Sequence, residues 1–325
     1  MTAGVPAAPE LGEQVRAATA RWLETKKPAT RTAYAAELRA YQDYLDRSGT
    51  LALGATSADA ERYLAHRRQV GAADASIARS IAASTSWYEH MIAAGTAVSN
   101  PFEHIERPHL DPQDSATRVL TEPETQSLVY AAEHQPRRHG GRDTRPRDAL
   151  ALLLLLTLGM RASDMFALRI QHLTEHEGQR AIVMPVEQDT LMVRPIGAEL
   201  ERALHGHLVH RLGLVGQSAA EITLDELIAR LAPQELLVTT DSGRALDRPA
   251  LTHSLRRLAA LAAIEHPEQV TPQTLRLTFA AATAEQGADR PTLQRDLGHA
   301  DWRTTHRTLR RAARSKGRPA KNPPT

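Results

Sequence analysis

Hydrophobic side chains recur at helical spacing through the first hundred residues of the chain. The clearest repeat runs from Thr30 to Arg47, where apolar and aromatic positions follow at intervals of three and four: Tyr34, Leu38, Tyr41 and Leu45. Such spacing aligns these side chains on one face of a helix, with Thr30 as its predicted cap. Three further helices are predicted: Leu11 to about Thr25, one starting at Ser57, and Asp74 to about Ala94 with Asp74 as its cap. Short helices joined by short loops predict a compact bundle.

The helical pattern is interrupted at Asn100-Pro101, and prolines and polar residues follow. We predict a linker between two domains at residues 108–118. Helix resumes after Thr121, the predicted cap, because Pro123 falls in the first helical turn. The apolar run from Ala149 to Met160 spans about twelve residues, whereas a membrane span needs about twenty. This run therefore predicts a buried helix, and no membrane partner is expected.

Beyond Leu173 the spacing changes from helical to strand-like. Two short apolar runs, Ala181 to Met184 and Leu191 to Ile196, flank a polar segment and predict a β-hairpin. Leu236 to Thr239 is a further candidate strand, and helical spacing returns from Asp247. The predicted fold class is mainly α with a small β-hairpin or sheet.

Charge is spread unevenly along the chain. The sequence holds 40 basic and 38 acidic residues, a formal net charge of +2. Residues 290–325, however, hold 10 bases and 2 acids, a net charge of +8 (10 − 2). Thirty-six of the bases (40 − 4) are arginines, whose guanidinium groups can bind phosphate oxygens through two parallel hydrogen bonds. The C-terminal segment therefore favours a nucleic-acid partner, with a solvated tail as the alternative.

Several side-chain types are missing where chemistry would use them. Cysteine is absent, which excludes disulfides and a cysteine nucleophile. No lysine lies between Lys27 and Lys316, and no tyrosine follows Tyr130. The first ten residues lack the basic and apolar regions of a secretory signal, so a cytoplasmic location is expected.

Three segments with distinctive residues follow one another along the chain. The first is Asn100-Pro101-Phe102 with the prolines behind it, followed by Leu120-Thr121. The second is Leu158-Gly159-Met160-Arg161-Ala162-Ser163-Asp164. The third is Thr271-Pro272-Gln273-Thr274-Leu275-Arg276, with Leu297-Gly298-His299 downstream. In this order the three segments resemble the tyrosine recombinase (phage integrase) family, and the likeness extends over most of the chain. It implies a helical SAM-like core-binding domain and a tyrosine-recombinase-like catalytic domain.

The domain boundaries follow from the prolines and the motifs. We expect the core-binding domain at residues 1–107, the linker at 108–118, the catalytic-fold domain at 119–315 and a basic tail at 316–325.

In this family, breaking a DNA strand requires charge stabilisation at the phosphate, a proton donor and a tyrosine nucleophile. The resemblance assigns Arg161 and Arg276 as the two phosphate-binding arginines and His299 as the downstream histidine. As plain structural alternatives, Arg161 would pair with Asp164, and His299 would sit in a capping turn.

Three positions depart from the family pattern. Gln273 stands where a histidine is usual, three residues before the second arginine. The hairpin has no lysine to protonate the leaving oxygen, and its only base, Arg194, is a poor proton donor. Thr308 occupies the position of the nucleophilic tyrosine, and His306 would form only a labile adduct. A nucleophile supplied in trans would have to come from a different protein, because identical copies lack it too.

Further basic residues are candidate DNA contacts, each with a solvated surface as its alternative. These are Lys26, Lys27, Arg31, Arg79, Arg303 and Arg307. His205, His207 and His210 cluster without a zinc-binding spacing, so we interpret them as a helix surface. We expect neither a metal nor a cofactor.

Three functional hypotheses follow. The leading one is a duplex DNA-binding protein that forms no covalent strand intermediate by itself: an accessory or regulatory protein of recombination, or a remnant of a mobile element. It would act as a homo-oligomer on DNA or with an active recombinase, in the cytoplasm at the nucleoid. The second is an active integrase with a nonstandard or partner-supplied nucleophile. The third is a protein-interaction scaffold.

Overall fold

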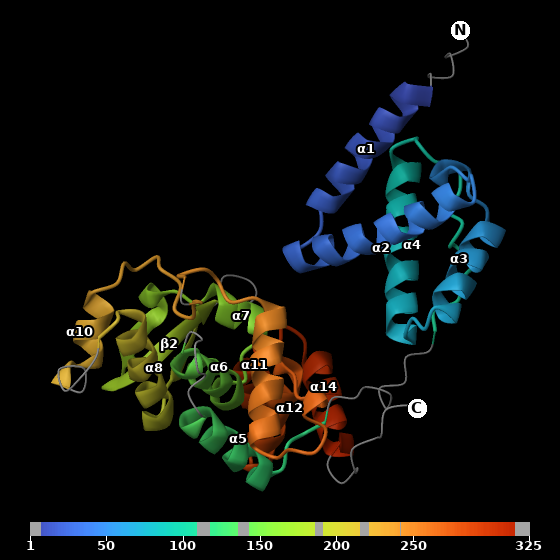
Figure 1. Ribbon diagram of the computed structural model, residues 1–325. Coiled ribbons are helices and arrows are strands. Elements are labelled where there is room, and N and C mark those ends of the chain that lie inside the picture. Colours follow the sequence, from blue (N-terminus) through green and yellow to red (C-terminus); the bar gives the residue numbers. More distant parts are fainter. Residues whose placement is uncertain are drawn as a thin grey trace. The chain divides into compact units, whose positions relative to one another are not determined.

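The computed structural model describes residues 8–108, 118–135, 143–185, 191–214, 221–240 and 242–315. The chain divides into two compact units, residues 1–111 and 112–325 (Figure 1). Apart from its first and last residues, the predicted linker lies outside the described residues, as does the predicted tail. None of the described helices combines the length and the apolar character needed to cross a membrane.

The first unit is helical throughout its described elements. Its helices are α1 (Ala8–Glu24), α2 (Pro28–Arg47), the 3-10 turn η1 (Ala52–Gly54), α3 (Ser57–Gln69) and α4 (Asp74–Ala93). Aromatic residues dominate its core, where Trp22, Trp87, Tyr41, Tyr63 and Tyr88 are each at most 1 % exposed. The expected bundle is therefore confirmed.

Two predicted caps in this unit are wrong. Helix α2 begins two residues before Thr30, at Pro28, because the fixed φ of proline suits the first helical position. Asp74 is the first residue of α4 rather than its cap, which is Ala73. The carboxylate of Asp74 therefore lies in the first helical turn, where its negative charge interacts favourably with the positive end of the helix dipole.

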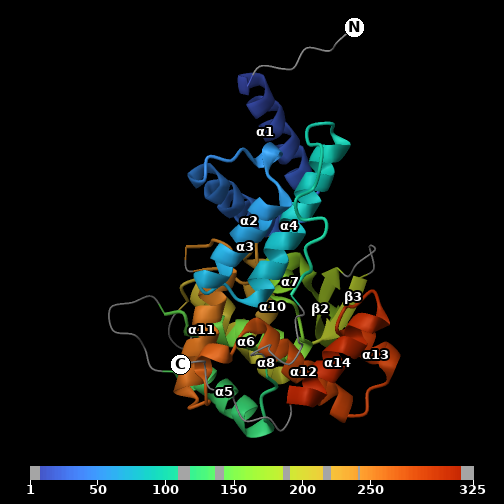
Figure 2. The same cartoon turned by 90° about the vertical axis from the view of Figure 1, so that its right-hand side faces the viewer.

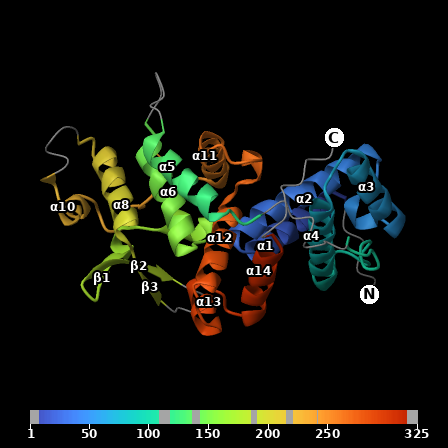
Figure 3. The ribbon, with the colours of Figure 1, turned by 90° about the horizontal axis from the view of Figure 1, so that it is seen from below.

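The second unit is built around α6 (Arg145–Leu158), a helix buried along almost its whole length. Helices α5, α8, α11 and α12 pack on it, and α14 packs on the far side of α12 (Figure 3). The helices around α6 are α5 (Glu122–His134), α7 (Ala162–Ala167), η2 (Ile170–His172), α8 (Ala198–Arg211), α10 (Leu224–Ala229), α11 (Arg248–Leu261), η4 (Pro267–Gln269), α12 (Pro272–Glu285), α13 (Arg290–Asp296) and α14 (Trp302–Ser315). Thr121 caps α5 as predicted, in a reciprocal capping box with Glu124.

The predicted hairpin is part of a three-stranded antiparallel sheet in the order β1-β2-β3. The strands are β1 (Leu173–His176), β2 (Gln179–Pro185) and β3 (Leu191–Pro195). The predicted strand at Leu236 to Thr239 does not form, because its ends bridge different partners: Leu236 pairs with Arg169, and Thr239 with Ala245. In the described ranges the chain is mostly helical with one small sheet, as the sequence predicts.

Candidate functional site

The site begins at the end of α6, where the chain must turn sharply. Gly159 has a left-handed conformation, with φ at 59°. A Cβ atom added there would lie 2.1 Å from Cδ1 of Phe279 on α12. Only glycine therefore fits, both for its backbone angle and for the close approach of α12. Two residues later, Arg161 stands at the N-terminus of α7.

Arg276 projects from α12 into the space beside this turn. Its residue is 6 % exposed. Its Nη1 donates to the Gly159 carbonyl and its Nη2 to the Leu297 carbonyl. The same Nη2 lies 3.0 Å from Nε2 of His299. One guanidinium thus joins the end of α6 to the segment after α13.

His299 is held on both ring nitrogens. Its Nδ1 lies 3.0 Å from Oγ1 of Thr305 on α14. Arg276 can only donate, so we assign Nε2 as the acceptor and place the proton on Nδ1, facing Thr305. Burial, followed by the charges of Arg276, Arg161 and Arg307, lowers the pKa of His299 to about 4. The histidine is therefore neutral at pH 7.

Arg161 meets the same segment from the other side. Its Nη2 donates to the Gly298 carbonyl at 2.9 Å, and its side chain stays 38 % exposed. Asp164 lies 3.9 Å away, which matches the expected ion pair only loosely. Burial, and then the charge of Arg161, lowers the pKa of Arg276 to about 10, while Asp164 opposes this. Two guanidinium charges therefore lie in one site, and among the described residues Asp164 is the carboxylate that acts on them.

Two positions that depart from the family pattern lie on helices that contribute to the site, Gln273 on α12 and Thr308 on α14. Gln273 is exposed in the first turn of α12, one turn before Arg276. Thr308 is half-buried on α14, and its hydroxyl donates to the Thr304 carbonyl at 2.9 Å. The Thr308 hydroxyl is therefore hydrogen-bonded within its own helix.

Arg194 on β3 is fixed against the same part of the site. Its Nη1 lies 3.0 Å from Oδ1 of Asp296 and 3.2 Å from the Asp296 carbonyl oxygen. Its guanidinium also lies over the ring of Phe279, 5.4 Å from the centroid. Arg194 thus holds Asp296, the residue directly before the segment 297–299 that meets Arg161 and Arg276. Sequence reasoning missed this role, because nothing in the local spacing links β3 to α13.

The DNA-contact candidates of the first unit have partners of their own. Arg31 donates to the carbonyls of Leu23, Glu24 and Lys26, and so caps α1. Arg79 pairs with Glu37 at 2.9 Å. Lys26 bonds to Ser86 and lies over the Trp22 ring, and Lys27 is exposed. In the second unit, Arg303 and Arg307 are exposed on α14.

The histidine cluster on α8 is not simply a helix surface. His207 is 2 % exposed, and its Nε2 contacts the Leu237 carbonyl at 3.0 Å. His205 contacts the Ile222 carbonyl. The surface interpretation is therefore wrong for His207, whose ring fills the interface with the 236–239 segment. Among the described residues, no group of three potential ligand side chains could hold a metal ion.

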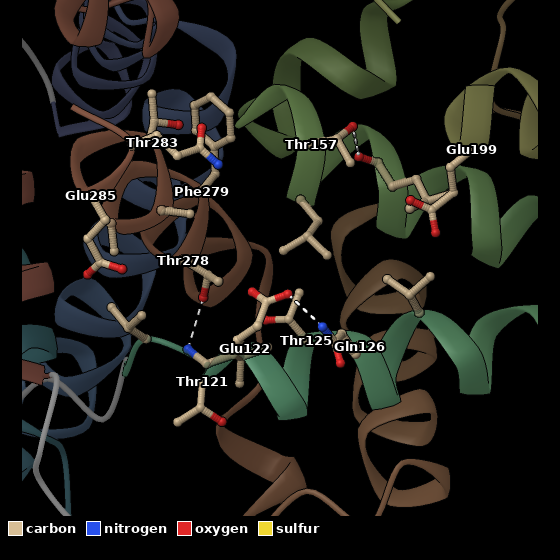
Figure 4. Close-up of a pocket in the computed structure, with 18 of the residues that line it drawn as sticks. Thr121, Glu122, Thr125, Gln126, Thr157, Glu199, Thr278, Phe279, Thr283 and Glu285 are labelled. Atoms are coloured by element: carbon tan, nitrogen blue, oxygen red, sulfur yellow. Dashed lines mark hydrogen bonds between the residues drawn. The ribbon is translucent and has the colours of Figure 1, made fainter. Parts of the chain in front are cut away.

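A separate groove of about 900 Å³ lies between α5, α6 and α12 (Figure 4). Glutamates stand around it, contributed by α5, α8 and α12: Glu122, Glu133, Glu199 and Glu285. Arg161, Arg276 and His299 are not among its lining residues. An acidic rim repels phosphate, so this groove is distinct from the arginine site.

Comparison with known families shows to which of them the chain belongs. A profile of the phage integrase family matches residues 118–314, and a profile of its N-terminal SAM-like domain matches residues 22–95. The chain belongs to the phage integrase family. Tyrosine recombinase XerD of Halalkalibacterium halodurans is 30 % identical over 244 residues, which cover 75 % of this chain and 73 % of that protein. Tyrosine recombinase XerC of Pelobacter propionicus is 28 % identical over 312 residues, covering 91 % and 90 %.

Solved integrase structures share the fold. A lambda integrase (75–356) dimer bound to a COC' core site has a TM-score of 0.66 at 15 % identity, covering 95 % of this chain and 98 % of that one. The XerH recombinase bound to palindromic difH has a TM-score of 0.62 at 17 % identity, covering 86 % and 76 %. These likenesses confirm the two-part integrase fold.

Proposed function

We propose that this integrase-family protein binds duplex DNA through a backbone phosphate held by Arg161 and Arg276, and does not itself cleave the strand. The observation that carries the proposal is the excess positive charge of this site. Two guanidinium groups converge on residues 297–299, His299 is neutral, and Asp164, 3.9 Å from Arg161, supplies only one negative charge. An anion such as a phosphate diester would relieve the repulsion between the two guanidinium groups and accept hydrogen bonds from their remaining N–H groups.

The absence of strand cleavage rests on the groups that should perform it. No tyrosine follows Tyr130, and the expected position is a threonine whose hydroxyl donates to its own helix. Arg194, the base on β3, is held by Asp296, and an arginine is a poor proton donor. The protein would therefore bind the phosphate with neither a nucleophile to attack it nor an acid to release the leaving oxygen.

A trapping assay tests the missing covalent step. Genomic DNA fragments retained by the protein would be converted to suicide substrates by nicking, so that any covalent adduct accumulates. We expect retention of the duplex and no covalent band. A covalent band that disappears in Thr308→Phe would identify Thr308 as a nucleophile and overturn the proposal. A band that persists in Thr308→Phe would overturn it through another nucleophile.

Salt dependence tests the phosphate contact. We expect the affinity for duplex DNA to fall steeply with salt, and Arg161→Gln to weaken it about tenfold. Because Arg161 is 38 % exposed, this variant should fold, and thermal unfolding checks that it does. Retention that ignores salt and is unchanged by Arg161→Gln would favour a protein-interaction scaffold instead.

The biological role that fits these properties is accessory or regulatory, at DNA in the cytoplasm. Related proteins support assembly on DNA, since lambda integrase is described as a dimer on a core site and as a tetramer on a Holliday junction. The protein would act as copies on one site or beside an active recombinase. Adding an active recombinase to the trapping assay tests this role: a changed yield or position of its covalent adduct would support it.

A further inference from the structure

Helix α14 carries a row of arginines on the side that faces away from the protein. Arg303, Arg307, Arg310 and Arg314 follow at intervals of four, three and four, and all four are exposed. At about 100° per residue, these positions fall within an arc about 60° wide. We call these four residues the arginine stripe.

The opposite side of α14 holds the helix on the protein. Thr305 is fully buried against His299, and Ala312 packs with Leu277 and Ala281 of α12. Leu309 packs near Phe279 and Leu297. Figure 2 shows α14 beside α12 and α13. Since these contacts fix the helix, the arginine stripe is presented on a rigid support.

The stripe has almost no internal counter-charge. Within the described part of the chain, its one ion pair joins Arg303 Nε to Asp301 at 4.0 Å, with the Arg303 side chain 93 % exposed. The charge of Arg307 also acts on His299, so the stripe begins close to the arginine pocket. Four cations in a row, left to solvent, repel one another and favour a partner with regularly spaced negative charge.

The surroundings favour a polyanion over a protein or a membrane. A protein interface needs an apolar centre, and none of the large exposed apolar side chains of the described residues lies on α14. Insertion into a lipid surface needs the apolar face of the helix, which is already occupied by α12. The stripe is about 16 Å long, which matches four to five successive phosphates of one DNA strand measured along the duplex axis.

We propose that the arginine stripe of α14 is a second DNA contact, which follows the phosphate backbone next to the phosphate held by Arg161 and Arg276. The helix on which the family places its nucleophile would here bind the phosphate backbone of the DNA. This inference rests on the proposed function, because it presupposes that the protein binds duplex DNA.

The test compares two sets of four arginine-to-glutamine changes in the full chain. One set neutralises the stripe: R303Q, R307Q, R310Q and R314Q. The matched control neutralises four exposed arginines on or beside α8, α10 and α11: R202Q, R230Q, R248Q and R256Q. Both variants lose the same charge. The measurements are duplex affinity between about 50 and 200 mM salt, thermal unfolding, and sedimentation to report the oligomeric state.

If the stripe binds phosphates, its variant should make the negative slope of log affinity against log salt shallower by about 3 to 4, because each contact contributes about 0.9 to its magnitude. The control should make the slope shallower by less than about 1. Equal effects of the two sets, or a stripe variant that binds DNA like the wild type, would overturn the inference. A stripe variant that alters only the oligomeric state would also overturn it, in favour of an acidic protein partner.

The design separates this inference from the proposed function. If wild-type protein shows no salt-dependent binding to duplex DNA, the proposed function itself fails. If the wild type binds and Arg161→Gln weakens binding while the stripe variant does not, only the stripe inference fails.

Discussion

At the scale of single residues, two histidines couple the fold to pH. His207 and His299 are both nearly buried, and burial is the largest cause that lowers the pKa of each to about 4. The unfolded chain binds a proton at each histidine near pH 6.5, whereas the native state does so only near pH 4. Unfolding therefore takes up protons in this range, so native stability is complete above about pH 6.5 and falls as the pH decreases.

We accordingly predict that the free energy of unfolding decreases between pH 6.5 and pH 5 by about 1 to 2 kcal/mol per histidine. Urea unfolding at several pH values measures it. His299→Gln should remove about half of the decrease, whereas His306→Gln, at an exposed position, should leave it unchanged. A decrease of the same size in His299→Gln would contradict the assignment to His299.

Thr308 occupies the position at which the family resemblance places the nucleophilic tyrosine, and it is one of the three departures from that pattern. It lies on α14, one turn after Thr304, on the helix whose Thr305 bonds to His299. We predict that Thr308→Tyr yields a covalent adduct on a nicked suicide substrate, where the wild type yields none. Adding Gln273→His should raise the rate by about 100-fold, the usual contribution of an added general acid or base. Thr308→Phe is the control, and absence of any adduct in Thr308→Tyr would count against retention of a working pocket.

At the scale of elements, the contact between β3 and α13 fixes the end of α13, directly before the segment that meets Arg161 and Arg276. Arg194 is 12 % exposed at its side chain and bonds to both the side chain and the carbonyl of Asp296. We predict that Arg194→Ala lowers the free energy of unfolding by about 2 kcal/mol, because it leaves a partly buried carboxylate with only the 4.0 Å contact to the exposed Arg295. Chemical denaturation measures this loss.

A matched control lies on the same carboxylate. Arg295 approaches Asp296 only to 4.0 Å and is 67 % exposed, so Arg295→Ala should change stability by less than about 0.5 kcal/mol. Similar losses for Arg194→Ala and Arg295→Ala would show that the contact between β3 and Asp296 does not contribute more to the free energy of unfolding than an exposed ion pair.

The close packing of α6 against α12 requires that residue 159 has no Cβ atom. Gly159→Ala must bear both the left-handed φ and the overlap with Phe279, and we predict a loss of about 3 kcal/mol or more. Gly287→Ala isolates the first effect, because φ there is 85° and nothing lies within 4 Å of an added Cβ. It should cost only about 1 to 2 kcal/mol, and thermal denaturation compares the two. Equal losses would refute the role of Phe279.

Elements with a strong local signal could be predicted from the sequence. The Thr121 cap with Glu124 is a short-range pattern and was found at its expected place. The sequence does not predict strand β1, because Leu173–His176 is mostly polar and is defined by its pairing with β2. Arg161, Arg276 and His299 could be found from motif order. The carbonyls that hold them, and the link from Arg194 to Asp296, exist only once distant segments meet.

At the scale of the whole molecule, each unit has its own hydrophobic core. The buried cluster of the first unit runs from Ala18 to Phe102, and that of the second begins at Leu120. We predict that a fragment of residues 1–111 unfolds cooperatively in urea, with an m-value of about 1 to 2 kcal/mol/M. Trp22 and Trp87, both at most 1 % exposed, report the transition by fluorescence. A fragment that unfolds without a cooperative transition would show that the second unit is needed.

The uneven distribution of aromatic residues has a practical consequence. Trp302 is the only tryptophan beyond residue 111, and it starts α14 beside Arg303, with the guanidinium of Arg290 5.5 Å from its ring centroid. In a background of Trp22→Phe and Trp87→Phe, all indole emission would come from the first residue of the helix that bears the stripe. The protein thus carries its own optical probe at the surface where it is expected to meet DNA.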